Sequence, residues 1–154
     1  MQIDEGSLER LREIGLFGGL SDETLRLHCE QRAPLTCEEG QRIYREGESG
    51  RVMYVILEGR VEMIRRDKRG NEGVARLLSA GQWFGEKSIL DVQARPTSAR
   101  TAERSLLLPI SAQDLDVLYR RDLKGYALLV LNLAREMSRQ LRSYEAQVFE
   151  LLRA

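Results

Sequence analysis

Short strands separated by glycines dominate the middle of the chain and restrict its fold more than any other feature. Between residues 33 and 110, runs rich in Val, Ile, Tyr and Leu, such as RVMYVILEG, are interrupted about every 8–12 residues by turn signals. Strands this short and this regularly spaced predict an antiparallel sandwich or a closed barrel. The glycines that separate the runs are Gly40, Gly47, Gly50, Gly59, Gly70, Gly73 and Gly81.

Helical patterns flank the β-rich region on both sides. Before it, Leu8, Leu11 and Ile14 recur at helical spacing. The pattern breaks at a Gly-Gly pair, and Ser21 then has the residue type of a helix N-cap. We therefore predict three zones in one domain: N-terminal helices over residues 1–32, a β-barrel over residues 33–110 and C-terminal helices over residues 111–154.

The C-terminal zone is expected to end in one long helix that begins near Arg121. Its first half carries apolar residues on more than one face, which predicts burial against the barrel and a second surface. A helix of about 30 residues is ~45 Å long, more than a small barrel covers. The apolar stripe could pack back on its own barrel, but the overhang favours a parallel homodimer through this helix. The stripe has packing-seam spacing and comprises Leu123, Tyr126, Val130, Leu133, Met137, Leu141, Tyr144, Val148 and Leu151.

Charge and composition exclude several classes of protein. Lys+Arg and Asp+Glu both number 24, so no overall positive field attracts nucleic acid or a membrane surface. No helix-turn-helix follows the long helix, so direct DNA binding by this chain is not expected. No apolar run approaches the ~18 residues of a membrane span, and the acidic start is unlike a secretory signal. The two cysteines form no disulfide framework, and we predict a cytoplasmic protein without membrane contact.

Catalytic and metal-binding patterns are absent from the sequence. His28 is the one histidine, too few for the ligands of a metal-dependent barrel enzyme. GxGxxG and P-loop motifs are missing, and no nucleophile is paired with a base. The basic run RRDKRG, residues 65–70, is typical of a solvated hairpin turn. We therefore predict a protein that is not an enzyme and uses no catalytic cofactor or metal.

The segment WFGEKSILDVQARPTSARTA, residues 83–102, combines groups that suit an anionic ligand. Gly85 permits a tight turn out of a strand, and the next five residues suffice for one helical turn whose free N–H groups suit an anion. Arg95 adds a planar fork of donors. Glu86 would accept hydrogen bonds from the hydroxyls of a ribose.

Two alternatives remain open for this segment on residue types alone. Thr97 and Ser98 add hydroxyl groups that would complete a nucleotide pocket. Glu86 and Arg95 could instead form a surface ion pair, which contributes only ~0–1 kcal/mol. The aromatic side chains just before Gly85 favour packing in the barrel over a stacking platform for a base.

The segment and its surroundings resemble the cyclic nucleotide-binding domain family, which includes bacterial catabolite activator proteins, regulatory subunits of cyclic-AMP-dependent kinases and cyclic-nucleotide-gated channels. The resemblance runs from about Leu11 to Arg142. LFGGLSDETL resembles the entry helix, EGQRIYREGESGRVMYVILEGRVEMI the early strands, and FGEKSIL followed by Arg95 the phosphate-binding cassette with kinase-type spacing. It implies a mainly β fold, an eight-stranded jelly-roll-like barrel (double-stranded β-helix) with N-terminal helices and a long C-terminal helix.

The resemblance also implies roles for individual residues. The cassette glutamate of the family takes the ribose 2′-hydroxyl and the arginine takes the cyclic phosphate, and these roles fall on Glu86 and Arg95. Backbone groups around Gly85, Lys87 and Ser88 would line the ribose and phosphate. The ligand-binding residues implied are Phe84, Gly85, Glu86, Lys87, Ser88, Arg95, Pro96, Thr97 and Ser98.

Pro96 departs from the family pattern, which usually has a small residue there whose N–H reaches the phosphate. Proline has no N–H, and a lost charge-assisted hydrogen bond costs about 1.5–3 kcal/mol, roughly one to two decades in affinity. Threonine at this place is associated in the family with cyclic GMP, so the sequence favours cyclic AMP. We expect a sensor that signals by movement of the C-terminal helix to a downstream partner of unknown identity. The alternative is a degenerate barrel that serves as a dimerisation or interaction module without nucleotide.

Overall fold

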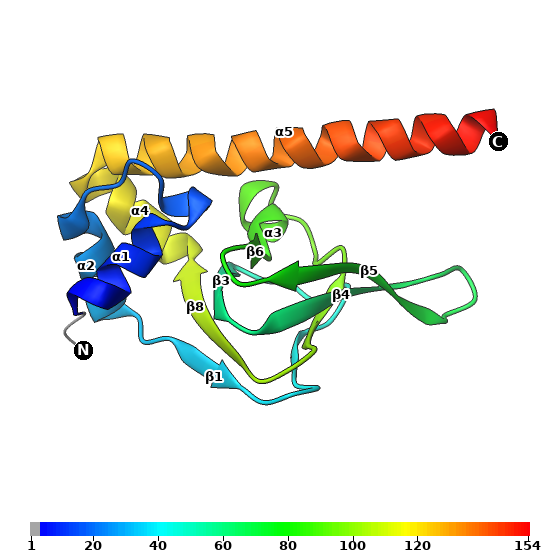
Figure 1. Cartoon of the computed structure of the whole chain (residues 1–154), viewed down its shortest axis with the longest axis horizontal. Helices are drawn as coiled ribbons and strands as arrows, with labels where there is room; N and C mark the ends of the chain where they lie inside the picture. Colours follow the sequence, from blue (N-terminus) through cyan, green and yellow to red (C-terminus); the bar gives the residue numbers. More distant parts are fainter. Residues whose placement is uncertain (1–3) are drawn as a thin grey trace.

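A computed structural model describes residues 4–154 and confirms the mainly β, jelly-roll-like fold (Figure 1). In these residues eight strands form two four-stranded antiparallel sheets. Residues 1–3 of the predicted N-terminal zone lie outside the described part. The first sheet has the order β1 (Leu35–Cys37), β8 (Ser105–Ser111), β3 (Val52–Glu58) and β6 (Trp83–Phe84). The second has the order β2 (Arg42–Tyr44), β7 (Ser98–Thr101), β4 (Arg60–Arg66) and β5 (Glu72–Ser79).

The two faces of the first sheet bury two separate hydrophobic clusters. Side chains alternate across a strand, so Val55 of β3 faces the helices while its neighbour Ile56 faces the second sheet, and both are fully buried. Leu107 and Leu108 of β8 divide in the same way. Phe84 belongs to the cluster between the sheets. The end of β6, where the cassette begins, is therefore anchored in the barrel core.

The N-terminal helices form as their sequence signals predict. The first helix, α1 (Glu5–Arg12), is followed by a short 3₁₀ turn, η1 (Gly15–Phe17), and by α2 (Asp22–Gln31). The break falls at the predicted Gly-Gly pair. Ser21 is the N-cap of α2, and its hydroxyl accepts the N–H of Thr24 at 3.2 Å. Leu8, Leu11 and Leu16 pack with the apolar face of the first sheet.

Two helices follow the barrel. A capping box between Ser111 and Asp114 starts α4 (Ala112–Arg121), and Asp122 caps α5 (Leu123–Arg153), the predicted long helix. The first half of α5 packs on α4 and η1 through Leu129 and Leu133. The other faces of this half are not covered: Leu123 is 61% exposed and Leu131 is 44% exposed. The expected burial of the first half on two faces is therefore not found within one copy of the chain.

Asn132 explains why the covered face of α5 lies where it does. Its side-chain amide donates hydrogen bonds to the carbonyl oxygens of Leu16 and Gly18, each at 3.0 Å. These bonds fix the rotation of α5 against η1, because a buried amide is costly unless its donors are satisfied. The apolar stripe predicted from spacing alone did not include this polar contact.

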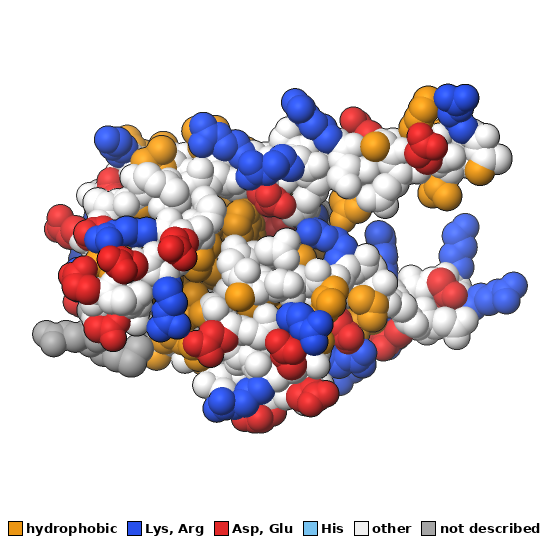
Figure 2. All heavy atoms as spheres, in the orientation of Figure 1, with side chains coloured by type: hydrophobic (Ala, Val, Ile, Leu, Met, Phe, Trp, Pro, Cys, Tyr) orange, Lys and Arg blue, Asp and Glu red, His pale blue; other side chains and the backbone are white. Residues whose placement is uncertain are grey.

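The second half of α5 extends past the barrel, and every residue from Leu141 to Ala154 is exposed (Figure 1). Figure 2 shows this part standing clear of the β4–β5 hairpin, with hydrophobic side chains at its surface. Its exposed large hydrophobic residues are Leu141, Tyr144, Val148, Phe149, Leu151 and Leu152. Among residues 4–154 no helix is both long and apolar enough to cross a membrane.

Candidate functional site

The cassette begins where β6 leaves the barrel. Gly85 has φ of 85°, in the left-handed region that favours glycine. A Cβ at this position would lie 2.8 Å from Nη1 of Arg95 and 3.1 Å from the carbonyl oxygen of Val52. The predicted single helical turn follows as α3 (Glu86–Leu90), and a loop then leads to Arg95 and β7. The turn at Gly85 thus brings the start of α3 against the arginine ten residues later.

Arg95 is buried at the centre of this arrangement, with 4% of its surface exposed. Its Nη1 donates to the carbonyl oxygen of Gly85 at 2.8 Å and its Nη2 to that of Val52 at 2.6 Å. Its backbone N–H donates to the carbonyl oxygen of Glu48 at 2.8 Å. The ion pairs found among residues 4–154 do not include Arg95. The guanidinium is therefore a buried cation held by neutral groups.

Two further residues shape the arginine site, and sequence reasoning missed both as site residues. The ring of Tyr44 lies under the guanidinium, with 4.0 Å between Cζ of Arg95 and the ring centroid. Burial raises the pKa of the Tyr44 hydroxyl above its ordinary value. Gly50 lies against the same guanidinium, since a Cβ there would overlap its Nε, Cζ and Nη2 atoms. Both residues lie far before the cassette in sequence, in GQRIYREGESG, and only the barrel brings them to it.

Two buried polar atoms at the cassette lack a hydrogen-bond partner. They are Nε of Arg95 and Oγ of Ser88, and among residues 4–154 no other side-chain nitrogen or oxygen that is fully buried lacks one. Ser88 is the third residue of α3 and is 4% exposed. Buried polar groups are almost always satisfied in folded proteins. Two unsatisfied groups in one cassette therefore make it the candidate site for an external group.

Glu86 is also buried, yet it does not pair with Arg95. Its Oε1 lies 3.6 Å from Nζ of the exposed Lys87, and its side chain is 6% exposed. A surface ion pair between Glu86 and Arg95, the alternative left open by the sequence, is absent from the described residues. The carboxylate and the guanidinium are thus both available at one cassette, as an acceptor group and a donor group.

The remaining residues predicted for the site lie around this centre with different environments. Phe84 is buried behind the cassette and stacks on Tyr54, with 5.4 Å between ring centroids. Pro96 is exposed. Thr97 is half-buried and lies near the hydroxyl of Tyr44. The hydroxyl of Ser98 accepts the backbone N–H of Glu46 at 2.8 Å, so it joins β7 to the turn after β2.

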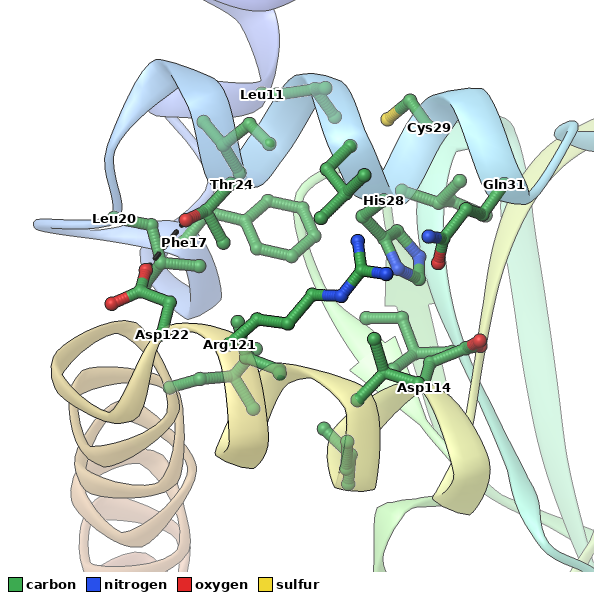
Figure 3. A pocket seen from close by; sticks show the side chains of 18 residues that line it. Leu11, Phe17, Leu20, Thr24, His28, Cys29, Gln31, Asp114, Arg121 and Asp122 are labelled. Carbon is green, nitrogen blue, oxygen red and sulfur yellow. Dashed lines mark hydrogen bonds between the residues drawn. The ribbon is translucent and has the colours of Figure 1, made fainter.

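A separate apolar pocket of about 60 Å³ lies between α2, α4 and the start of α5 (Figure 3). The polar side chains of Thr24, His28 and Asp114 in this pocket have partners within the protein. The Nε2 of His28 is 3.1 Å from the carbonyl oxygen of Pro109, and burial lowers the pKa of this imidazole. The hydroxyl of Thr24 donates to Asp122 at 2.6 Å, and Asp114 caps α4. This pocket therefore lies where the N-terminal and C-terminal helices pack together.

Comparison with known proteins agrees with the fold and the cassette. The profile of the cyclic nucleotide-binding domain matches residues 34–122. The chain is 32% identical to the cyclic AMP receptor protein of Thermus thermophilus over 133 residues, which cover 86% of this chain and 60% of that protein. The catabolite activator protein of Thermus thermophilus superposes with a TM-score of 0.77 at 31% identity, covering 89% of this chain and 62% of that one.

A more distant structure shows the same fold. The regulatory subunit of a cAMP-independent protein kinase A from Trypanosoma brucei has a TM-score of 0.74 at 22% identity, and the match covers 94% of this chain and 51% of that one.

This chain spans about 60% of the length of the Thermus relative. Within residues 4–154 no group of three or more His, Cys, Asp or Glu side chains is placed to hold a metal ion. The matched residues, which include the whole cassette, show that the chain belongs to the cyclic nucleotide-binding domain family.

Proposed function

We propose that this chain is a regulatory sensor that binds a cyclic nucleotide, cyclic AMP, at the cassette and performs no catalysis. The observation that carries the proposal is the state of Arg95. Its guanidinium is 4% exposed, is held by two carbonyl oxygens and a tyrosine ring, and has a free Nε. Removing a charge from water costs several kcal/mol unless an opposite charge compensates it. An anion beside Nε would supply that charge.

A cyclic nucleotide matches both charged groups of the cassette. Its phosphate is an anion that accepts hydrogen bonds, which suits Arg95. Its ribose has a free 2′-hydroxyl that donates, which suits the buried carboxylate of Glu86. Backbone and side-chain groups of Gly85, Lys87 and Ser88 would border the ribose and phosphate. Phe84, Pro96, Thr97 and Ser98 would form the surrounding wall.

The choice of cyclic AMP rests on the relatives and on one residue. The Thermus thermophilus relative is a cyclic AMP receptor protein, and Pro96 stands where threonine accompanies cyclic GMP in the family. The kinase subunit of Trypanosoma brucei is described as cAMP-independent, so the fold does not determine the ligand. Cyclic GMP is therefore the comparison ligand in every titration.

Calorimetric titration of the folded protein with cyclic AMP and cyclic GMP tests the proposal. We expect Arg95→Lys to weaken cyclic AMP binding by roughly 10- to 100-fold, because lysine keeps the charge but lacks the planar fork of donors. Arg100→Lys is the matched control, since Arg100 lies on β7 and pairs with Glu62 of β4 at 2.9 Å. Absence of heat with wild-type protein at millimolar cyclic nucleotide would refute the proposal.

We further propose that α5 carries the signal and joins two copies of the chain. Ile89 of α3 packs against the hydrophobic cluster that contains Leu129 and Leu133 of α5. A ligand that moves α3 would therefore alter the packing of α5, by no more than its difference in affinity for the two arrangements. The exposed stripe beyond Leu141 has the spacing of a helix-packing seam. A parallel pairing of two α5 helices would cover it.

A second candidate function follows from Pro96, which contributes no N–H at the cassette. In this alternative the barrel binds no nucleotide and serves only as a dimerisation or interaction module. Titration separates the two candidates, because the alternative predicts a dimer without cyclic nucleotide binding. Under either candidate we expect a cytoplasmic protein that makes no direct DNA contact through these residues. Its downstream partner would be recognised through the position of α5.

A further inference from the structure

We propose that the pocket between α2, α4 and the start of α5 is a second binding site, which takes a small carboxylate with a short aliphatic tail. The pocket is separate from the cassette, because none of the residues that line it lies between residues 84 and 98. The proposal therefore does not depend on the proposed function. It rests on the apolar wall of the pocket, on the charge of Arg121 and on the size of the space.

The wall of the pocket is mostly apolar and belongs to the hydrophobic cluster between the first sheet and the helices. Phe17, Leu25 and Leu129 line the pocket and are buried. Leu20 and Leu118 also line it and pack against the same cluster. Water beside such a wall finds few hydrogen-bond partners. The space therefore suits an aliphatic group better than it suits water.

Arg121 brings a positive charge to this apolar space. It is exposed, and Figure 3 shows its side chain extending from α4 across the pocket toward His28 and Gln31 of α2. Within the described part of the chain, its guanidinium has no ion pair and no hydrogen bond. A guanidinium presents a planar fork of donors that matches the two oxygens of a carboxylate. The side-chain amide of Gln31 adds a further donor to the lining.

The acidic residues of the pocket are already engaged, so Arg121 decides which charge the ligand carries. Asp122 accepts the hydroxyl of Thr24 at 2.6 Å. Asp114 pairs at 3.1 Å with Arg32, which does not line the pocket. An anionic head group would therefore meet a cation that has no partner, whereas a cationic head group would meet a like charge.

The volume of the pocket limits the tail of the ligand. An apolar cavity of about 150 Å³ accommodates benzene, which corresponds to about 25 Å³ for each carbon atom. The pocket of about 60 Å³ then holds a tail of about two to three carbons. Butyrate, which has three carbons beyond its carboxyl group, is therefore the straight-chain acid expected to fill it.

Straight-chain acids from acetate to hexanoate, titrated without cyclic nucleotide into isotope-labelled protein and followed by NMR chemical shifts, test the site. Each buried methylene favours binding about fourfold. Affinity should rise by that factor per carbon up to butyrate and rise no further with hexanoate. The shifted amides should belong to α2, α4 and the first turns of α5. Shifts elsewhere, a rise that continues through hexanoate, or no saturable shift with any acid would overturn the proposal.

Arg121→Gln tests the charge. We expect it to weaken butyrate binding roughly 10- to 100-fold, the range for hydrogen bonds to a charged group. Butyramide has the same tail without the charge, so its affinity should fall less. Arg120→Gln is the matched control, because Arg120 also lies on α4 but pairs with Asp116 and does not line the pocket. If Arg121→Gln binds butyrate as wild type does, the arginine only covers apolar surface with its aliphatic stem, and the proposal fails.

Discussion

Gly50→Ala should disable the anion site without a direct change to any proposed ligand contact. The added Cβ would overlap the Nε, Cζ and Nη2 atoms of Arg95. These atoms belong to the far end of a flexible side chain, which can move more easily than the backbone at Gly50. The guanidinium must therefore leave its position over Tyr44 and its two carbonyl partners. No other residue named as a ligand contact is touched by the substitution.

The size of the effect follows from the bonds that the displacement breaks. Arg95 loses its bonds to Gly85 at 2.8 Å and to Val52 at 2.6 Å. The free energy of unfolding should fall by about 1–3 kcal/mol, because hydrogen bonds to water replace part of what the two lost bonds contribute. Loss of the arginine from the ligand removes at least one bond to a charged group, about 1.5–3 kcal/mol. Affinity for cyclic AMP should therefore drop by roughly 10- to 150-fold.

Gly73→Ala is the matched control for this experiment. Gly73 is exposed on β5, and a Cβ there meets no atom within 4 Å. Both variants would be compared with wild type by urea unfolding and by calorimetric titration with cyclic AMP. We expect Gly73→Ala to behave as wild type in both measurements. Wild-type affinity in folded Gly50→Ala would show that the guanidinium position seen here is not the one that binds the ligand.

Two further predictions concern the helices. Leu141→Lys should dissociate a dimer at micromolar concentration in sedimentation, whereas Ala146→Lys on the opposite side of α5 should not; a monomeric wild type would contradict the dimer. For Asp114, burial opposes ionisation, but hydrogen bonds from Ser111 and Arg32 lower its pKa below the ordinary value. Because the native pKa lies below the unfolded one, this stabilisation is present above about pH 4 and is lost at lower pH. Urea unfolding should show Asp114→Asn destabilised at neutral pH and the difference shrinking below about pH 4; a constant difference would contradict it.

The barrel was predictable because its determinants are local. Glycines mark the turns and β-branched runs mark the strands, so element types follow from short windows of sequence. The start of α2 at Ser21 and the single turn after Gly85 were predictable for the same reason. Resemblance to a family supplied the strand count and the roles of Glu86 and Arg95. Those roles remain proposals, although the structure brings both residues to one cassette.

The parts that escaped prediction depend on contacts between distant segments. Tyr44 and Gly50 look like an ordinary strand residue and an ordinary turn glycine until the barrel places them against Arg95. Asn132 looks like a surface residue of an amphipathic helix, yet its amide holds α5 on η1. Spacing rules count apolar residues and give no weight to one satisfied polar contact. The stripe predicted from spacing includes the buried Leu133 but not the buried Asn132.

Pro96 has two opposing effects on binding, and their magnitudes decide which dominates. Proline fixes φ near −65° and limits the freedom of the unbound loop, which contributes about 0.4–1 kcal/mol where the native geometry suits it. Hydrogen bonds from Arg95 to Glu48 and from Gly47 to Arg95 already hold the preceding residue, so the gain lies toward the lower end. A missing charge-assisted bond costs about 1.5–3 kcal/mol. Stiffening alone cannot offset that loss. Tight binding therefore requires other donors, and the buried groups of the cassette that lack a partner are the Nε of Arg95 and the hydroxyl of Ser88.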